Sequence, residues 1–177
     1  MTGAGVSERI LLVGMMGAGK TTAGKLVAEK LGWDYLDSDA EVERTTGLTV
    51  PEIFARDGEA AFRGAEADAL RRACASGEPV VVAVAGGAVL SPENRTLLRA
   101  CGRVIWLRAR TETLADRVGD GIGRPLLDGD PAAALQRLDA VRRPLYAEVA
   151  DDTIDVDGLG PAEVAALIIE RGCGAGT

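Results

Sequence analysis

One segment near the start of the chain, Ile10 to Thr22, constrains the fold more than any other. The apolar run Ile10–Val13 predicts a buried strand, and the apolar periodicity after Lys20 predicts a helix. Between them lies Gly14-Met-Met-Gly-Ala-Gly-Lys-Thr21, which fits the pattern G-x-x-x-x-G-K-[ST] with the strand before and the helix after that a phosphate-binding loop requires. The sequence therefore predicts a polyphosphate site directly after the first strand.

The residue types in this loop explain how it would bind. Glycines let backbone N–H groups approach a polyphosphate closely, and the following helix adds the positive end of its dipole. Lys20 can reach the β- and γ-phosphates, and the Thr21 hydroxyl is placed to bind Mg²⁺. The alternative, a flexible turn that binds nothing, is disfavoured because motif and context agree. The residues expected at the nucleotide are Gly17, Ala18, Gly19, Lys20, Thr21 and Thr22.

Length and charge limit the class of protein. A chain of 177 residues suits one domain with a substantial core, so we expect a single domain over residues 1–177. The formal net charge of −7 disfavours a nucleic-acid binder, which usually presents a basic surface. No apolar run approaches the roughly 18 residues of a membrane span, and the N-terminal segment lacks the features of a signal peptide. We expect a cytoplasmic monomer without nucleic-acid or membrane partners.

The cysteine and histidine content narrows the chemistry. The chain has three cysteines, Cys74, Cys101 and Cys173, and no histidine. The odd count and the absence of C-x-x-C argue against a disulfide framework or a zinc site, so we expect free thiols. Without imidazole, a general base has to be a carboxylate or a less usual group.

Segments that predict strands alternate with segments that predict helices. Further strands are expected near 33–36, 80–84, 103–107 and 153–156, and helices near 20–31, 39–45, 59–75, 91–100, 111–118, 131–149 and 161–171, with a short helix from Val50 that ends before Gly58. Such alternation implies a parallel sheet with helices on both faces, a three-layer α/β/α sandwich. The core should span about residues 9–171, and the ends 1–8 and 172–177 are expected to be disordered.

Two carboxylates follow the second predicted strand. Ligands of parallel sheets bind beyond the carboxyl ends of the strands, which places Asp37 and Asp39 near Thr21. One carboxylate can hold a water on the metal, and the other can orient or deprotonate a hydroxyl nucleophile. The alternative is a helix-capping pair without a chemical role, in which Asp39 is the candidate cap.

Arg63 and Arg142 lie on two predicted helices. A guanidinium binds a carboxylate through two parallel hydrogen bonds, so two arginines aimed into one pocket suit a carboxylate substrate. The alternative is solvated helix faces with salt bridges to residues such as Glu66. The turn Ala85-Gly86-Gly87 after the third strand lets the backbone approach a ligand, or is simply a tight turn.

A glycine-rich segment at about residues 119–129 predicts a mobile lid. Arg124 within it can neutralise charge on a transferring phosphoryl group, and Arg117 before it can stack on adenine. The alternative is a surface loop with ordinary charges.

These residues resemble the shikimate kinase family over about residues 9–171. The matching stretches are Gly14–Thr22, Leu36–Asp39, Ile53–Glu59, Phe62-Arg63 with Glu66, Gly86–Val89, Arg124–Leu127 and Arg142–Tyr146. The first is shared with many kinases, whereas Phe-Arg and Arg-x-Pro-Leu-Tyr are more specific. The resemblance implies a P-loop kinase fold with a five-stranded parallel sheet ordered 2-3-1-4-5 and a mobile lid.

The resemblance also implies transfer of the ATP γ-phosphoryl group to the 3-hydroxyl of shikimate with Mg²⁺, a step towards chorismate and the aromatic amino acids. It implies catalytic roles for Lys20, Asp39 and Arg124, shikimate contacts by Asp39, Arg63, Gly86, Gly87 and Arg142, metal contacts by Thr21 and Asp37, phosphate contacts by Arg124, and an adenine contact by Arg117. Glu66 would position Arg63, and the substrate-binding helices would span about residues 39–75.

The chain departs from the family at two places. Ala85 stands where the family usually has a glycine, and Asp157–Pro161 lacks the basic residue often seen near the adenine. The competing functions are a kinase of another small metabolite such as gluconate or a nucleoside monophosphate, a GTP-dependent switch, and a silent nucleotide-binding protein. Asn94, the only asparagine, is not in the Asn-Lys-x-Asp context of a guanine site, which disfavours the switch.

Overall fold

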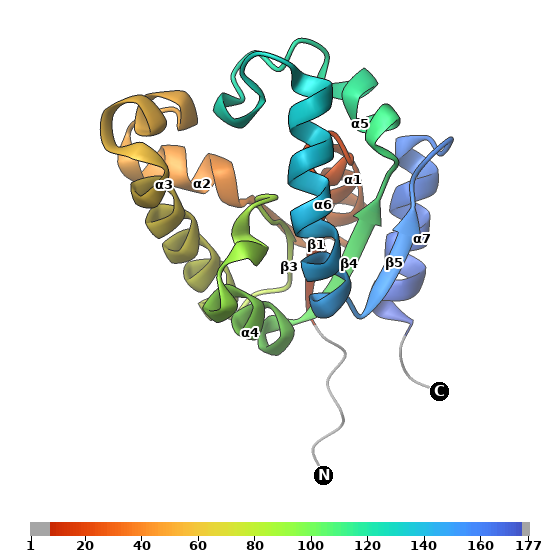
Figure 1. Cartoon of the computed structure of the whole chain (residues 1–177). Helices are drawn as coiled ribbons and strands as arrows, with labels where there is room; N and C mark the ends of the chain where they lie inside the picture. Colours follow the sequence, from red (N-terminus) through yellow and green to blue (C-terminus); the bar gives the residue numbers. More distant parts are fainter. Residues whose placement is uncertain (1–7, 175–177) are drawn as a thin grey trace.

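The computed structural model describes residues 8–174, and its strands form one parallel sheet. The strands are β1 (Arg9–Val13), β2 (Asp34–Asp37), β3 (Val80–Ala83), β4 (Arg103–Arg108) and β5 (Asp152–Asp155). Their order in the sheet is β2-β3-β1-β4-β5, which confirms the predicted topology (Figure 1).

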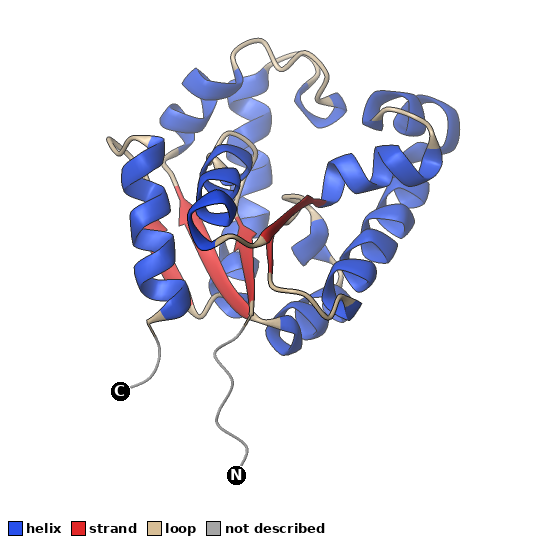
Figure 2. Ribbon diagram, turned by 180° about the vertical axis from the view of Figure 1, so that it is seen from behind, coloured by secondary structure: helices blue, strands red, loops and turns tan. Residues whose placement is uncertain are grey.

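Helices cover both faces of this sheet. They are α1 (Lys20–Leu31), α2 (Ser38–Thr46), α3 (Val50–Ala75), α4 (Pro92–Cys101), α5 (Thr111–Val118), α6 (Pro131–Val149) and α7 (Pro161–Cys173). Figures 1 and 2 show α6 on one face of the sheet and α1 and α7 on the other, while α2 and α3 extend beyond the β2 side. The three-layer arrangement is therefore confirmed. No helix in the described part of the chain is long and apolar enough to cross a membrane.

The register of the sheet gathers the ends of three strands. Leu12 of β1 pairs with Ala83 of β3, and Ala83 also lies opposite Asp37 of β2. The phosphate-binding loop, the turn after β3 and the segment after β2 therefore leave the sheet side by side. The side chains on both faces of the central strands are buried under helices, which explains why these strands are continuous apolar runs in the sequence.

A second, smaller core supports α2 and α3. Val42, Ile53, Phe62 and Ala69 are buried against one another, apart from the main core around the sheet. The sequence predicted two helices separated at Gly58, and the structure has α3 interrupted there by a glycine with φ 83°. The positive φ suits glycine and produces the break between the two helical halves.

Two expectations for helix ends are wrong. Asp37 rather than Asp39 caps α2, because Asp37 keeps an extended backbone and its side chain accepts from the backbone N–H groups of Asp39 and Ala40. Near the C-terminus, residues 172 and 173 were expected to be disordered, but they form the last part of α7, and Gly172 is buried beside Ile10. The remaining predicted disordered positions, 1–7 and 175–177, lie outside the described residues, and Glu8 and Gly174 lie at the edges of the described part.

The expectation of free thiols is also wrong for two of the cysteines. Cys74 and Cys101 form a disulfide, with their Cα atoms 5.3 Å apart, while Cys173 is free. They occupy the last turns of α3 and α4, two helices that pack together. A spacing rule such as C-x-x-C detects only cysteines that are close in sequence, whereas this pair is 27 residues apart.

The disulfide predicts a redox-dependent stability. Closing a loop of 27 residues restricts the unfolded chain and stabilises the fold by roughly 3–4 kcal/mol. We expect reduction, or the substitution Cys74→Ser, to lower the Tm by roughly 10 °C. Cys173→Ser should leave the Tm unchanged and serves as the control. Three reactive thiols in the denatured, unreduced protein, or equal Tm values with and without reductant, would contradict the pairing.

Candidate active site

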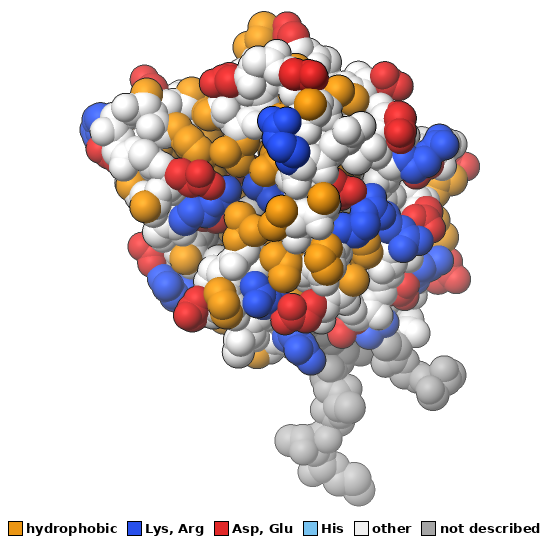
Figure 3. All heavy atoms as spheres, in the orientation of Figure 1, with side chains coloured by type: hydrophobic (Ala, Val, Ile, Leu, Met, Phe, Trp, Pro, Cys, Tyr) orange, Lys and Arg blue, Asp and Glu red, His pale blue; other side chains and the backbone are white. Residues whose placement is uncertain are grey.

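A cavity of about 650 Å³ opens where β1, β2 and β3 end, between the phosphate-binding loop, α2 with α3, and the segment that follows α5. In Figure 3, Lys and Arg side chains lie beside hydrophobic side chains in the hollow between α3 and the segment that follows α5. The lining residues come from segments far apart in the sequence, as the topology requires.

The side chain of Lys20 folds back and holds the phosphate-binding loop. Lys20 Nζ donates to the carbonyl oxygens of Gly14 and Met15, at 2.7 and 3.0 Å. Gly14 has φ 145°, and a Cβ there would lie 2.5 Å from the Leu107 carbonyl oxygen, so only glycine fits. Burial lowers the pKa of Lys20 to about 8, although Asp39 and Asp37 oppose that shift. Gly17, Gly19, Lys20, Thr21 and Thr22 line the cavity, whereas Ala18 is buried beneath it.

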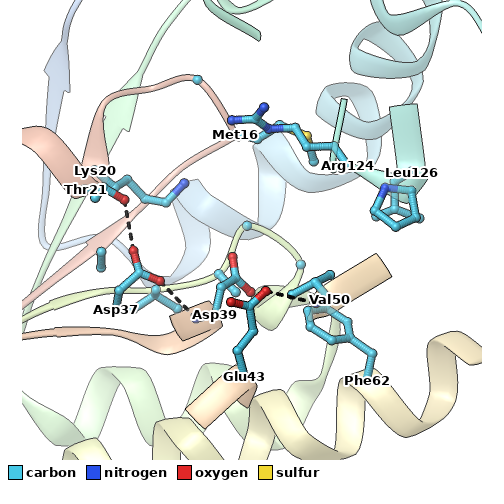
Figure 4. A pocket seen from close by; sticks show the side chains of 18 of the residues that line it. Met16, Lys20, Thr21, Asp37, Asp39, Glu43, Val50, Phe62, Arg124 and Leu126 are labelled. Atoms are coloured by element: carbon cyan, nitrogen blue, oxygen red, sulfur yellow. Dashed lines mark hydrogen bonds between the residues drawn. The ribbon is translucent and has the colours of Figure 1, made fainter. Parts of the chain in front are cut away.

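One corner of the cavity offers hard oxygen ligands. Thr21 Oγ1 donates to Asp37 Oδ2 at 2.9 Å, while Asp37 Oδ1 caps α2 (Figure 4). Asp37 can therefore cap α2 and also bind a metal ion, because the capping hydrogen bonds and the Thr21 hydroxyl use different carboxylate oxygens. A hydroxyl and a carboxylate suit Mg²⁺, which takes few protein ligands and fills its shell with water and phosphate. The described residues contain no cluster of three His, Cys, Asp or Glu side chains that could hold a metal alone.

Asp39 lies in the first turn of α2 and lines the cavity (Figure 4). Burial raises the pKa of Asp39, and the charge of Asp37 raises it further, while Lys20 and Arg63 oppose the shift. A carboxylate with a raised pKa accepts a proton more readily than an exposed aspartate.

Arg63 is held in place by Glu66. Its Nη1 donates to both Glu66 carboxylate oxygens at 3.0 Å, and its Nη2 pairs with Glu59 at 3.2 Å. Glu66 is 1% exposed, and burial raises its pKa to about 7 despite the opposing charge of Arg63. Arg63 Nε is buried without a hydrogen-bond partner.

Arg142 is almost completely buried and has no counter-ion among the described residues. Its Nε and Nη1 lack hydrogen-bond partners, an arrangement that is costly unless an anion binds there. A Cβ on Gly86 would lie 3.3 Å from Arg142 Nη1, and one on Gly87 would lie 2.5 Å from Arg63 Cζ. The glycine turn therefore leaves the space that the two guanidinium groups fill.

The segment after α5 closes the other side of the cavity. Arg117 Nη1 donates to the Gly17 carbonyl oxygen at 3.1 Å, which ties α5 to the phosphate-binding loop. Arg124 lines the cavity and extends towards that loop beside Met16 (Figure 4). Leu127 is buried and anchors the segment, whereas Ile122 is 81% exposed.

The structure brings together nearly all the predicted site residues, and it adds several that sequence reasoning missed. The additional cavity-lining side chains are those of Met16, Glu43, Val50, Phe54, Phe62, Ala83, Val84, Pro125 and Leu126. Most are apolar residues whose sequence pattern is that of an ordinary helix or loop. Five of them lie in the stretches that carry the family resemblance, although nothing there marked them individually as site residues: Met16, Phe54, Phe62, Pro125 and Leu126.

The comparisons with known proteins agree with this geometry. Residues 16–172 match the model of the shikimate kinase family. A shikimate kinase of Symbiobacterium thermophilum is 50% identical over 92% of this chain and 94% of its own length, and one of Moorella thermoacetica is 48% identical over 91% and 92%. The structure of shikimate kinase from Acinetobacter baumannii in complex with shikimate has a TM-score of 0.89 and 40% identity over 92% of this chain and 90% of that chain.

The buried Glu66 carboxyl predicts a pH-dependent stability. Because its folded pKa of about 7 lies above the ordinary value of 4.5, the folded state holds a proton that the unfolded state releases, so stability falls as pH rises from 4.5 to 7. Glu66→Gln cannot ionise. We expect this variant to gain about 1–3 kcal/mol relative to the wild type between pH 5 and pH 8, measured by urea unfolding. A difference that is constant with pH would contradict the shift.

Proposed function

This chain belongs to the shikimate kinase family, and we propose how its residues perform the reaction of that family. The chain is an ATP-dependent kinase that transfers the γ-phosphoryl group to the 3-hydroxyl of shikimate, a step in aromatic amino acid biosynthesis. The observation that carries this function is the buried Arg142 and the partly buried Arg63, both with buried unpartnered nitrogens, in the same cavity as a phosphate-binding loop. A likeness to a gluconokinase of Sinorhizobium meliloti, at 22% identity and a TM-score of 0.62, shows the fold alone.

The phosphate end of the cavity would bind ATP. Lys20 would leave its loop carbonyl partners and contact the β- and γ-phosphates, aided by the backbone N–H groups of Gly17 to Thr22. Arg124 would reach the transferring phosphoryl group from the lid at about residues 119–129, and Arg117 would lie at the adenine. Thr21 and Asp37 would hold Mg²⁺, which neutralises charge on the phosphates when it is bound.

Asp39 would act on the nucleophile. Its carboxylate lies between the phosphate-binding loop and the arginines, where it can accept a hydrogen bond from the 3-hydroxyl of shikimate. The raised pKa would let it take the proton as the oxygen attacks the γ-phosphorus. Alignment and charge neutralisation supply most of the catalysis in phosphoryl transfer, so orienting the hydroxyl is as important as removing its proton.

Arg63 and Arg142 would hold the shikimate carboxylate. Glu66 fixes Arg63 from behind, which leaves its Nε and the nitrogens of Arg142 for the substrate. Gly86 and Gly87 would line the same end and keep it open. In this orientation the ring hydroxyls would point towards Asp39 and the phosphate-binding loop.

We also propose a single kinase domain with its core at about residues 9–171 and its substrate-binding helices at about 39–75. The separate small core between α2 and α3 supports the assignment of residues 39–75 as a substrate-binding unit within the domain. We propose further that the chain acts as a monomer in the cytoplasm without nucleic-acid or membrane partners; its net charge of −7 disfavours binding to nucleic acid.

Removal of Arg142 tests the substrate end of the site. We expect Arg142→Ala to raise KM for shikimate by roughly 100-fold and KM for ATP by less than about threefold, because a charge-assisted contact to the carboxylate is lost. The matched control is Arg143→Ala, since this neighbouring arginine pairs with Asp139 and does not line the cavity. An equal rise in both KM values would remove Arg142 from the substrate site.

The lowered pKa of Lys20 predicts an alkaline limit to nucleotide binding. Only the protonated amine attracts phosphate, so the affinity for ATP should fall as pH rises through about 8. We expect calorimetric Kd values for an ATP analogue to increase above that pH in the wild type. Lys20→Arg keeps its positive charge above pH 8, so its Kd should not increase with pH, even if the variant is catalytically inactive. The same increase of Kd with pH in both proteins would show that a group other than Lys20 titrates.

A further inference from the structure

The turn Ala85–Gly87 lies where the two halves of the cavity meet. A Cβ on Gly86 would lie 3.3 Å from both the Gly14 carbonyl oxygen and Arg142 Nη1. Gly86 therefore lies between the phosphate-binding loop and Arg142, with no room for a side chain to be added without pressing on both. Any displacement of this backbone moves the surface on which Arg142 rests.

Two buried hydroxyl groups hold this turn by its backbone. Ser38 Oγ accepts a hydrogen bond from the Ala85 N–H at 2.8 Å, and the Tyr146 hydroxyl donates to the Gly86 carbonyl oxygen at 2.6 Å. Ser38 is 1% exposed, and Tyr146 is fully buried. The two side chains come from α2 and α6, so the turn is tied to both helices that flank the cavity.

The neighbours of these hydroxyl groups are the residues of the site. Ser38 is adjacent to Asp39, and Tyr146 lies one helical turn after Arg142 on α6. Arg63 is oriented by Glu66, but no carboxylate of the described residues pairs with Arg142. Arg142 therefore has no carboxylate to orient it, and the groups next to its guanidinium are Gly86 and the Tyr146 hydroxyl, which interacts with it directly.

We propose that Tyr146 and Ser38 are positioning residues for the substrate carboxylate, because they fix the Ala85–Gly87 turn against which Arg142 is placed. The proposal rests on the proposed function, in which Arg142 binds that carboxylate. Neither hydroxyl lines the cavity, so each acts through the turn rather than on the substrate.

The surroundings of Tyr146 suit a fixed donor. Its ring packs against Trp106 with the centroids 5.8 Å apart, which restricts the ring. Burial raises the pKa of Tyr146 above its usual value, and the nearby charge of Arg142 offsets only part of that rise, so the phenol keeps its proton. Loss of the hydroxyl would leave the Gly86 carbonyl without this hydrogen bond in a partly buried position.

The test is steady-state kinetics of Tyr146→Phe and Ser38→Ala, each of which removes one hydroxyl group. We expect each to raise KM for shikimate by about 5- to 20-fold and to change KM for ATP by less than about twofold. Ser38→Thr keeps the hydroxyl and should restore a KM for shikimate near that of the wild type. Ile168→Val, in the core of α7 away from the cavity, controls for a general loss of stability.

Arg142→Ala, measured in parallel, separates the two levels of inference. If it raises KM for shikimate while both hydroxyl variants leave that KM unchanged, the positioning proposal is overturned and the proposed function stands. An equal rise in both KM values in the hydroxyl variants would also overturn it. If the wild type does not phosphorylate shikimate, or Arg142→Ala leaves its KM unchanged, the carboxylate site itself is wrong and both inferences fall.

Discussion

Burial of charge is the constraint on which this site depends. Lys20, Arg63 and Arg142 share a cavity with Asp39, and Glu66 is buried behind Arg63. These positions remove much of the hydration of the charged groups, so each charge has to be compensated. Glu66 compensates Arg63, and loop carbonyls compensate Lys20. Arg142 lacks such a partner among the described residues, and its buried nitrogens form the strongest internal sign of an anionic ligand.

The parallel sheet is the means by which these charges meet. The register of β2, β3 and β1 places the segments that follow these strands at the same edge of the sheet. Arg63 on α3 and Arg142 on α6 reach this edge from different helices. The glycine turn after β3 occupies the centre of this arrangement, where any side chain at Gly87 would displace Arg63. The turn therefore lies next to both the phosphate-binding loop and the arginines proposed to bind the substrate.

Much of the site could be predicted because its chemistry is local in sequence. The phosphate-binding loop carries its own motif, and the strand pattern places Asp37 and Asp39 at the same edge. The disulfide, the Asp37 cap and the hydrogen bonds of Ser38 and Tyr146 were not predicted, because each depends on a distance across the fold or on a local dihedral angle. The strand order came from the family resemblance, and the structure confirms it.

The most direct measurement is ADP release from Mg-ATP by the purified protein, with shikimate, quinate, gluconate and nucleoside monophosphates offered separately. A cavity with two arginines at one end and Asp39 near the phosphate-binding loop predicts rapid turnover with shikimate and far slower turnover with the others. Selective turnover of another acceptor, or none with shikimate, would contradict the assignment of Arg63 and Arg142 to the shikimate carboxylate.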